Sequence, residues 1–328
     1  MPADRRGSPR PPRAVVLGDL VLDVVLSPDE PLRRGTDVSG RVQLRQGGSA
    51  ATTARWLARS GVPTALVTAV GRDEIGRRLV AVLQGVGVEV RATTLAGAGT
   101  GRLGVVLEAD GERSFVADRG AILLLSPRHL RAAWFRGSGL LHLPAYSLLA
   151  EPLAGAALAA EAWVSRGGGA VSVDLASAGF LDRFGPGAVL DRVAGLRPAV
   201  ILATAEESAA ALGGAGPERL LELAPLVVVK EGAAGARALR RDRRPVAVRG
   251  RVIRLRDSTG AGDAFDAGFL AAWLRSGGRE HGAGQDAERR GSRSSPDTEG
   301  LRRWLRAGQA AARGEVTGRR LILDGLSD

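Results

Sequence analysis

Near its C-terminal end the chain contains Arg256-Asp257-Ser258-Thr259-Gly260-Ala261-Gly262-Asp263-Ala264-Phe265-Asp266-Ala267-Gly268-Phe269, a glycine-rich stretch with three aspartates. Before it, apolar residues alternate with arginines over 251–256, which predicts a short strand. After it, Ala264–Leu274 is rich in Ala, Leu, Phe and Trp, which predicts a buried helix that ends at Gly277 and Gly278. The chain therefore turns on glycines between a strand and the N-terminus of a helix.

Such a turn favours an anion next to a proton acceptor. Gly260 and Gly262 let the backbone approach a ligand closely, and the amides of the first helical turn have no partner within the helix. These amides and the helix dipole favour phosphate, whereas the carboxylate of Asp263 repels it. The two features agree if Asp263 takes a proton from a hydroxyl while the amides hold the phosphoryl group that the hydroxyl attacks. The alternative is that Asp263 only caps or charges the helix N-terminus.

Length and composition indicate one α/β domain with a small appendage. The chain has 328 residues, 45% hydrophobic and 25% charged, as in an ordinary soluble globular protein. The absence of cysteine excludes disulfides, thiolate metal sites and cysteine catalysis, and three histidines leave few options for a histidine metal site. No uninterrupted apolar run reaches about 18 residues, and Asp19 and Asp23 interrupt the only candidate signal segment. We therefore expect a cytoplasmic protein without a membrane partner.

The net charge of +11 comes almost entirely from arginine. One interpretation is nucleic-acid binding through phosphate contacts. The other is a scattered arginine-rich surface together with a polyanionic nucleotide substrate. Arginines are spread from end to end, the basic stretches lack interleaved aromatic residues and no recognition motif occurs, so nucleic-acid binding is disfavoured.

The N-terminal part predicts a tail followed by a strand that carries two carboxylates. Residues 1–13 lack apolar periodicity and are predicted to be disordered, and residues 14–328 are predicted to form the domain. Ala14–Val25 is an apolar run, so the charges of Asp19 and Asp23 are costly there unless they are partnered or reach a cleft. Because side chains alternate along a strand, both aspartates would share one face. Alternatively, Asp19 is a turn residue at a strand end.

Two further stretches predict half-exposed strands outside the main sheet. Residues 38–44 alternate between apolar and polar residues, and Asp110-Gly111 predicts a hairpin between residues 103–107 and 113–117. Gly47 and Gly48 precede a predicted helix, where their amides could face the hydroxyls of a ligand. The alternative for these two glycines is a plain helix start.

From Leu140 onward the pattern repeats as strand–helix units, which is typical of a parallel, doubly wound sheet. The predicted strands are Leu140–Leu143, Ala170–Asp174, Ala199–Leu202 and Leu226–Val229; the predicted helices are Glu151–Ser165, Gly187–Arg192, Glu206–Leu212, Pro217–Leu223 and Leu301–Arg313. Ligands of such folds bind at the carboxyl ends of the strands, where Asp174, Thr204, Glu207 and Lys230 fall. Residues 279–299 are rich in Gly, Ser and charge, which predicts a disordered insertion.

Asp257–Phe265, followed by Gly268-Phe269-Leu270, resembles the C-terminal signature of the ribokinase-like (PfkB) carbohydrate kinases. Gly47-Gly48 with Thr52 resembles their N-terminal signature Gly-Gly-x-x-x-Asn, with Thr in place of Asn. The resemblance covers about residues 14–316. It implies the ribokinase-like fold: an α/β three-layer sandwich with a mainly parallel central sheet and a small β-strand lid, here from about residues 27–46 and 91–118. The family's lid also implies a homodimer formed through it.

The resemblance also implies roles for individual residues. Asp263 would be the general base, and the amides of Gly260, Ala261 and Gly262 would form the anion hole. Gly18–Asp23 matches the family's opening Gly-x-x-x-x-Asp, whose aspartate accepts hydrogen bonds from sugar hydroxyls. The implied substrate-binding residues are Asp23, Gly47, Gly48 and Thr52. The hydroxyl of Thr52 cannot present an amide's donor and acceptor together, so one sugar contact is lost or altered.

Three further matches concern the nucleotide and its cations. Thr204–Glu207 resembles the Asn-x-x-Glu motif that organises Mg²⁺ and phosphate, usually through water, with Thr204 in place of Asn. Glu207 would then be the magnesium partner, or it only charges the first turn of a helix. Lys230–Gly235 resembles the nucleotide-binding Thr-x-Gly-x-x-Gly loop with glycines Gly232 and Gly235; Lys230 could pair with a phosphate or be solvated surface. Asp257 matches a position that helps to hold a monovalent cation such as K⁺ in several members.

The implied reaction is Mg²⁺-assisted transfer of the γ-phosphoryl group of ATP to a hydroxyl of a sugar or related small molecule, with a nucleoside kinase as the alternative. A non-catalytic sugar- or nucleoside-binding protein on the same fold would explain Thr52 and Thr204. It would not explain an intact Asp263 with its glycines. After the predicted strand Leu140–Leu143 the sequence has no carboxylate through Tyr146, which disfavours a strict ribokinase and leaves the acceptor open.

Overall fold

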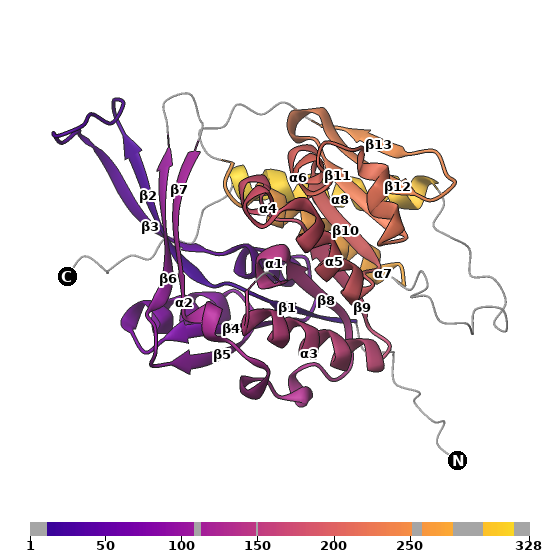
Figure 1. The fold of residues 1–328 in the computed structure, drawn as a ribbon, viewed down its shortest axis with the longest axis horizontal. Coiled ribbons are helices and arrows are strands. Elements are labelled where there is room, and N and C mark those ends of the chain that lie inside the picture. Colours follow the sequence, from indigo (N-terminus) through magenta and orange to yellow (C-terminus); the bar gives the residue numbers. More distant parts are fainter. Residues whose placement is uncertain (1–11, 108–112, 149, 251–257, 278–297, 318–328) are drawn as a thin grey trace, which may run out of the picture.

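The computed structural model describes residues 12–107, 113–148, 150–250, 258–277 and 298–317 (Figure 1). In these residues a nine-stranded sheet has the order β13-β12-β11-β10-β9-β8-β1-β4-β5. Its strands are β1 Arg13–Leu17, β4 Thr64–Gly71, β5 Glu89–Leu95, β8 Ser138–Pro144, β9 Ala170–Asp174, β10 Val200–Thr204, β11 Leu226–Lys230, β12 Gly235–Arg240 and β13 Val246–Arg249. All neighbours from β11 to β5 are parallel, whereas β12 and β13 are antiparallel.

Helices cover both faces of this sheet, because alternate residues of each buried strand point to opposite sides. On β1, Ala14 and Val16 belong to one hydrophobic core, and Val15 and Leu17 belong to the other. The first core includes residues of α1 Ser49–Arg59, α2 Glu74–Gly85, α7 Ala261–Arg275 and α8 Thr298–Thr317. The second includes residues of α3 Leu153–Arg166, α4 Ala178–Phe184, α5 Pro186–Leu196 and α6 Ala205–Ala211. The fold is therefore the expected ribokinase-like three-layer α/β sandwich.

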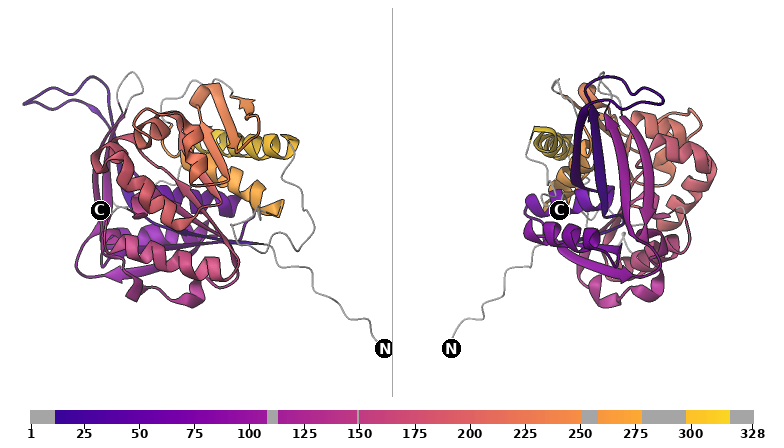
Figure 2. Two further views of the ribbon diagram at one scale, coloured as in Figure 1. Left: turned by 45° about the vertical axis from the view of Figure 1, so that its right-hand side comes forward. Right: turned by 90° about the vertical axis from the view of Figure 1, so that its left-hand side faces the viewer.

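A separate four-stranded sheet forms the lid, in the order β3-β2-β6-β7. Its strands are β2 Val21–Pro28, β3 Gly40–Gly47, β6 Thr100–Leu107 and β7 Arg113–Gly120. Figure 2 shows these strands side by side along one side of the α/β body. The small sheet thus confirms the lid as part of the fold, although its boundaries differ from the expected ones.

The predicted single strand over Ala14–Val25 is wrong. β1 ends at Leu17 and belongs to the central sheet, whereas β2 begins at Val21 and belongs to the lid. The chain changes sheets at Gly18, where a Cβ atom would lie only 2.7 Å from Ala50 Cβ. Asp19 is therefore a turn residue after β1, and the expectation that it shares a strand face with Asp23 fails. The apolar run hides the break because both segments are buried.

Other observed boundaries also differ from the predicted ones. The lid includes residues 21–26, whereas residues 91–95 form β5 of the central sheet. Arg13 belongs to β1 rather than to the tail, and α8 begins at Thr298, before the predicted start at Leu301. Periodicity did not reveal α4 or the β12–β13 pair, and Pro217–Glu222 is a 3-10 helix rather than an α-helix. The predicted strand at 252–255, Asp110-Gly111, Asp257 and residues 279–297 lie outside the described residues. Among the described helices, none combines the length and apolarity that a membrane span requires.

The strand order reverses direction next to β1. From β1 the chain proceeds outward to β4 and β5, and it then returns to β8 and proceeds the other way through β9, β10 and β11. Open α/β sheets bind ligands at such a switch, beyond the carboxyl ends of the strands. We therefore expect the ligand site at the loops after β1 and β8, and at the carboxyl ends of β9 to β11.

Candidate active site

The glycine turn before α7 is packed against two other helices. Gly260 is the N-cap of α7 with a left-handed φ of 76°, a conformation that favours glycine. A Cβ atom on Gly260 would lie 3.3 Å from Thr52 Cγ2 and 3.4 Å from Glu315 Oε1, so α1 and α8 both support the turn. The Ala261 amide donates to the Ser258 carbonyl at 3.1 Å. The amide of Gly262 follows at the open end of the helix, as an anion site requires.

Asp263 stands in the first turn of α7 and accepts a hydrogen bond from Ser49 Oγ at 2.5 Å. Loss of water around the carboxyl is the largest influence on Asp263 and raises its pKa well above the usual value. The Ser49 hydrogen bond and Lys230 act in the opposite direction, while Asp174 and Asp19 raise the pKa further. A half-buried carboxylate with a raised pKa holds a proton more strongly than an exposed one, which suits a proton acceptor.

The bond between Ser49 and Asp263 also joins the two predicted signatures. Ser49 is the first residue of α1, directly after Gly48, and lies 214 positions before Asp263 in the sequence. Thr53 Oγ1 donates to the backbone carbonyl of Asp263 at 3.5 Å, one turn further along α1. The N-termini of α1 and α7 therefore meet, and the Gly47-Gly48 turn lies beside residues 258–262. We call residues 258–262 the anion turn, after the anion site that the sequence predicts there. Sequence reasoning did not identify Ser49, although its place after two glycines was visible.

Asp19 is held between the main body and the lid. Its Oδ1 accepts from the Ala50 amide at 3.1 Å, and its Oδ2 pairs with Arg119 Nη1 at 3.2 Å. The guanidinium carbon of Arg119, which comes from β7, lies 3.7 Å from the centroid of the Tyr146 ring. Asp19, Arg119 and Tyr146 therefore meet at the switch between β1 and β8, with Asp263 close by. Sequence reasoning did not pair Arg119 with Asp19.

Asp23 lies on the lid strand β2, where it is buried opposite Arg45 of β3 and Leu103 of β6. A Cβ atom on Gly47 would overlap the Asp23 carboxylate, so only glycine allows the two to lie this close. Thr52 is buried as well, and its methyl group packs against Gly260. The predicted substrate residues therefore gather around the start of α1.

Lys230 is buried, so the alternative of a solvated surface lysine is wrong. Its Nζ lies 2.9 Å from Asp174 Oδ1 and 3.0 Å from Asp266 Oδ2. Burial alone would lower the pKa of Lys230, but Asp174, Asp266 and Glu207 outweigh it and raise this pKa well above the usual value. Lys230 therefore stays charged, and a Cβ atom on Gly262 would lie 3.6 Å from its Nζ. A fixed positive charge sits beneath the anion turn.

Sequence reasoning missed Asp266, which is fully buried on α7. It follows Asp263 by three positions, so both carboxylates lie on one face of the helix. Burial raises the pKa of Asp266, and Asp174 adds to that effect, whereas Lys230 opposes it. Its Oδ1 atom has no hydrogen-bond partner among the described residues. The signal in the sequence was an aspartate inside an otherwise apolar helical run.

Thr204 and Glu207 form a reciprocal cap at the start of α6. The Glu207 amide donates to Thr204 Oγ1 at 3.1 Å, and the Thr204 amide donates to Glu207 Oε2 at 2.7 Å. Burial and Asp174 raise the pKa of Glu207. Its ionised form is therefore disfavoured, and a nearby cation would stabilise that form. Among the described residues no group of three or more His, Cys, Asp or Glu side chains could hold a metal. Magnesium usually needs only one or two carboxylates beside phosphates and water, so these oxygen ligands fit it.

A cleft of about 500 Å³ connects most of the predicted nucleotide residues to the anion turn. Its lining includes Thr204, Lys230, Gly232, Gly235, Ala261 and Gly262. Asp23, Gly47, Gly48 and Thr52 do not line it; they gather at the start of α1, where Ser49 donates to Asp263. The sequence did not reveal the contributions of Arg113 from the lid and of Gln309 and Arg313 from α8. Arg113 Nη1 also donates to Thr259 Oγ1 at 3.2 Å, which ties the lid to the anion turn.

Comparisons with known proteins agree with this architecture. The profile of the pfkB family carbohydrate kinases matches residues 12–317. Over 275 residues the chain is 33% identical to a fructokinase of Klebsiella pneumoniae, an alignment that covers 78% of this chain and 82% of the relative.

Two solved structures share the fold at lower identity. Adenosine kinase from Sinorhizobium meliloti superposes with a TM-score of 0.79 at 20% identity, with 95% of this chain and 96% of that chain covered. A putative ribokinase II from E. coli, in complex with ATP and Mg²⁺, gives a TM-score of 0.75 at 21% identity, with 94% of both chains covered. The profile and the fructokinase alignment span most of the chain, and the fold with its strand-end cleft agrees with both. The chain therefore belongs to the pfkB family of carbohydrate kinases, phosphotransferases that act on an alcohol group.

Proposed function

We propose that this protein transfers the γ-phosphoryl group of ATP to a hydroxyl of a sugar, with Asp263 as general base. The observation that carries the proposal is the hydrogen bond from Ser49 Oγ to Asp263 Oδ1. A hydroxyl already donates at 2.5 Å to a carboxylate of raised pKa, at the junction of two glycine turns. An acceptor hydroxyl that replaces or joins Ser49 would meet the same carboxylate within hydrogen-bond reach.

In the proposed reaction the acceptor hydroxyl gives its proton to Asp263 while its oxygen attacks the γ-phosphorus. The bond between that phosphorus and the bridging oxygen breaks, and ADP leaves. The amides of Gly260, Ala261 and Gly262 stabilise the charge on the transferred group; loss of one such donor costs roughly 3–4 kcal/mol in other enzymes. The Ala261 amide must release the Ser258 carbonyl to take part. Lys230 adds a permanent positive charge beneath the turn.

The nucleotide is proposed to occupy the 500 Å³ cleft, with Thr204, Gly232 and Gly235 along its length. Mg²⁺ would neutralise phosphate charge when bound, and Glu207 is its proposed partner through water. Its carboxylate is already oriented by the Thr204 amide, which favours a relayed contact over a direct one. A monovalent cation beside Asp257 remains a proposal that rests on the family resemblance alone.

The acceptor is proposed to bind between the lid and the start of α1, where Asp23, Gly47, Gly48 and Thr52 gather. Fructose is the first candidate, because the relative that aligns over most of its length is a fructokinase. A buried carboxylate such as Asp23 makes charge-assisted hydrogen bonds to hydroxyls, worth roughly 1.5–3 kcal/mol each. The Asp23→Ala variant should therefore raise the KM for the acceptor about tenfold or more and leave the KM for ATP unchanged. Equal effects on both KM values would contradict this assignment.

A homodimer through the lid is also proposed. Val42, Phe115 and Val116 on β3 and β7 expose 65%, 52% and 76% of their surface, which is unusual for large apolar residues that lie on one sheet. The Val116→Asp variant should shift the protein from dimer to monomer in sedimentation equilibrium. A monomeric wild type would refute the dimer.

The test of the reaction is ADP release over a panel of sugars and nucleosides, with Asp263→Asn as the inactive control. Release that depends on fructose or another sugar supports the proposal, and release with a nucleoside alone supports the alternative of a nucleoside kinase. Isothermal titration of the protein with ATP and Mg²⁺, and with a sugar, identifies a third outcome, a non-catalytic binding protein. If ATP and a sugar bind but no acceptor yields ADP, the protein is a binding protein on this fold.

A further inference from the structure

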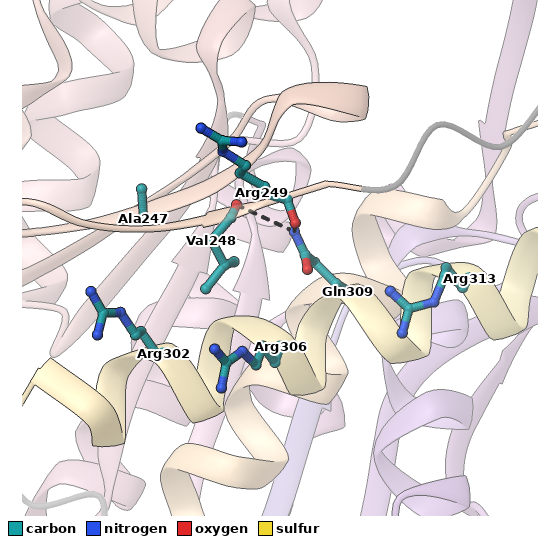
Figure 3. A pocket seen from close by; sticks show the side chains of 7 residues that line it. All are labelled: Ala247, Val248, Arg249, Arg302, Arg306, Gln309 and Arg313. Atoms are coloured by element: carbon teal, nitrogen blue, oxygen red, sulfur yellow. Dashed lines mark hydrogen bonds between the residues drawn. The ribbon is translucent and has the colours of Figure 1, made fainter.

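A second cavity, of about 470 Å³, lies between β13 and α8 (Figure 3). Its lining consists of Ala247, Val248, Arg249, Arg302, Arg306, Gln309 and Arg313, and we call it the arginine groove. Four of these seven residues carry a guanidinium group. None of them took part in the family resemblance, and only Gln309 and Arg313 also reach the nucleotide cleft.

The arginine groove has an excess of positive charge. Within the described part of the chain, Glu299 is the one carboxylate in ion-pair distance of these arginines, 3.7 Å from Arg302 and 3.4 Å from Arg306. Arg249 and Arg313 have no carboxylate partner there. Other arginines have a carboxylate partner, as Arg55 has in Glu315. Arg302, Arg306 and Arg313 place three like charges along one side of the cavity, and these repel each other unless an anion lies among them.

The arginines are arranged in a row rather than scattered. Arg302, Arg306 and Arg313 follow one another along α8, whereas the guanidinium of Arg249 on β13 points away from this helix (Figure 3). Positions that differ by four and seven share a helix face, so this row follows from the spacing. A solvated basic helix face would show the same spacing. The strand β13 distinguishes this case, because it closes the second side of the cavity.

Gln309 separates the arginine groove from the nucleotide cleft. Its Nε2 donates to the backbone carbonyls of Arg249 at 3.2 Å and of Val248 at 3.5 Å, which joins α8 to β13 (Figure 3). Gln309 and Arg313 line both cavities, so this bridge lies between them.

We propose that the arginine groove is a second ligand site, which binds a compact oligophosphate while the nucleotide cleft is filled. Guanidinium groups match phosphate oxygens in charge and in paired hydrogen-bond geometry. The cavity volume lies in the range of small-molecule sites, so the ligand is a free oligophosphate or the phosphate chain of a small metabolite. Arg302 and Arg306 do not line the nucleotide cleft, so the site does not depend on the reaction proposed above, although Gln309 and Arg313 line both cavities.

The experiment is a calorimetric titration of inorganic tripolyphosphate into the protein saturated with Mg²⁺ and a non-hydrolysable ATP analogue, with Mg²⁺ in excess throughout. The filled cleft directs the anion to the arginine groove. We expect one site per chain, and a loss of affinity of about tenfold or more in the double variant Arg302→Gln/Arg306→Gln. The matched control, Arg136→Gln/Arg183→Gln, removes the same charge from exposed positions elsewhere and should bind within twofold of wild type.

Arg302 and Arg306 are 45% and 64% exposed, so their replacement leaves the core unchanged. Titration with ATP in place of tripolyphosphate identifies a nucleotide's phosphate chain as the source if it binds as tightly. No binding to the saturated protein, or equal affinity in both double variants, overturns the proposal. Tighter binding of a short DNA duplex that the same variants weaken would also overturn it, in favour of nucleic acid.

Discussion

The surroundings of Asp263 disfavour the ionised form of its carboxyl group. Burial, Asp174 and Asp19 raise its pKa, and only Ser49 and Lys230 act against them. A folded-state pKa above the unfolded value means that the carboxyl stabilises the fold only at low pH, and this contribution is lost as the pH rises through the folded pKa. Above the folded pKa the ionised carboxylate therefore lowers the free energy of unfolding.

The Asp263→Asn variant should accordingly be inactive but no less stable. The amide keeps the shape of the side chain and removes its basicity, so turnover should fall by about 10²–10⁴-fold. Because the amide cannot ionise, the urea midpoint at pH 7 should be equal to that of wild type or higher. Turnover and urea unfolding measure the two effects. Turnover within about threefold of wild type would contradict the role of Asp263 as base.

Ser49 should influence the pKa of Asp263 and with it the pH dependence of the reaction. Its hydrogen bond lowers the pKa of Asp263, so Ser49→Ala should raise this pKa and move the acid limb of kcat/KM to higher pH. Asp174→Asn removes a nearby negative charge and should move the limb to lower pH. The full pH profile of kcat/KM is the measurement, and it reports the free enzyme. A limb that does not move in Ser49→Ala would mean that another group controls it.

At the scale of elements, the buried charges join three segments that are distant in sequence. Lys230 at the end of β11 pairs with Asp174 at the end of β9 and with Asp266 on α7. The side chains are 9%, 4% and 0% exposed, so water screens them little. The pairs hold the anion turn of α7 in place above the strand ends. Such a cluster is weak evidence for stability, because desolvation offsets the attraction.

The Lys230→Met variant should be strongly destabilised, since it leaves two buried carboxylates without their cation. Removal of one partner from a buried ion pair costs about 3–5 kcal/mol. The double variant Lys230→Met/Asp266→Asn should recover part of this loss, because one of the two orphaned charges is removed. Urea unfolding of wild type, both single variants and the double variant gives the coupling energy. Additive losses would show that Lys230 and Asp266 do not interact as the structure indicates.

At the scale of the whole molecule, the central sheet contains His142, which is fully buried on β8. Its Nδ1 lies 2.9 Å from Ser172 Oγ on β9. Burial lowers the pKa of His142 from 6.5 to about 4, an effect that Asp174 opposes and Lys230 reinforces. The folded protein thus keeps a neutral imidazole in its core at any pH above about 4.

The fold should therefore lose stability as the pH falls from about 6.5 towards 4. Between these pH values His142 is protonated in the unfolded chain but neutral in the folded chain, so the free energy of unfolding decreases. Between pH 7 and pH 5 this residue should account for about 2 kcal/mol. In urea unfolding, His142→Leu should show a smaller difference between the two pH values than wild type. The same difference in both proteins would assign the pH dependence to other groups.

The sequence by itself determined the features that depend on neighbouring residues. Alternation, apolar runs and glycine turns predicted the strands β8 to β11 within one or two residues, and with them the parallel sheet. Because parallel strands end at one edge, the positions of Asp174, Glu207 and Lys230 followed without further information. The glycines before Asp263 likewise predicted a helix that begins at an anion turn, since the backbone geometry there is local.

Only the tertiary structure decided which of these side chains meet, and in what surroundings. The chain leaves the central sheet after Leu17 although the apolar run continues, because Gly18 packs against α1 and not because of any local signal. Lys230 is buried because Asp174 and Asp266 meet it from 56 and 36 positions away. Asp19 meets Arg119 across 100 positions, and Gln309 of α8 reaches the backbone of Arg249 on β13 across 60 positions. Burial and pairing determine the surroundings of these charged side chains. Both depend on distances in space, which cannot be read from the spacing of residues along the chain.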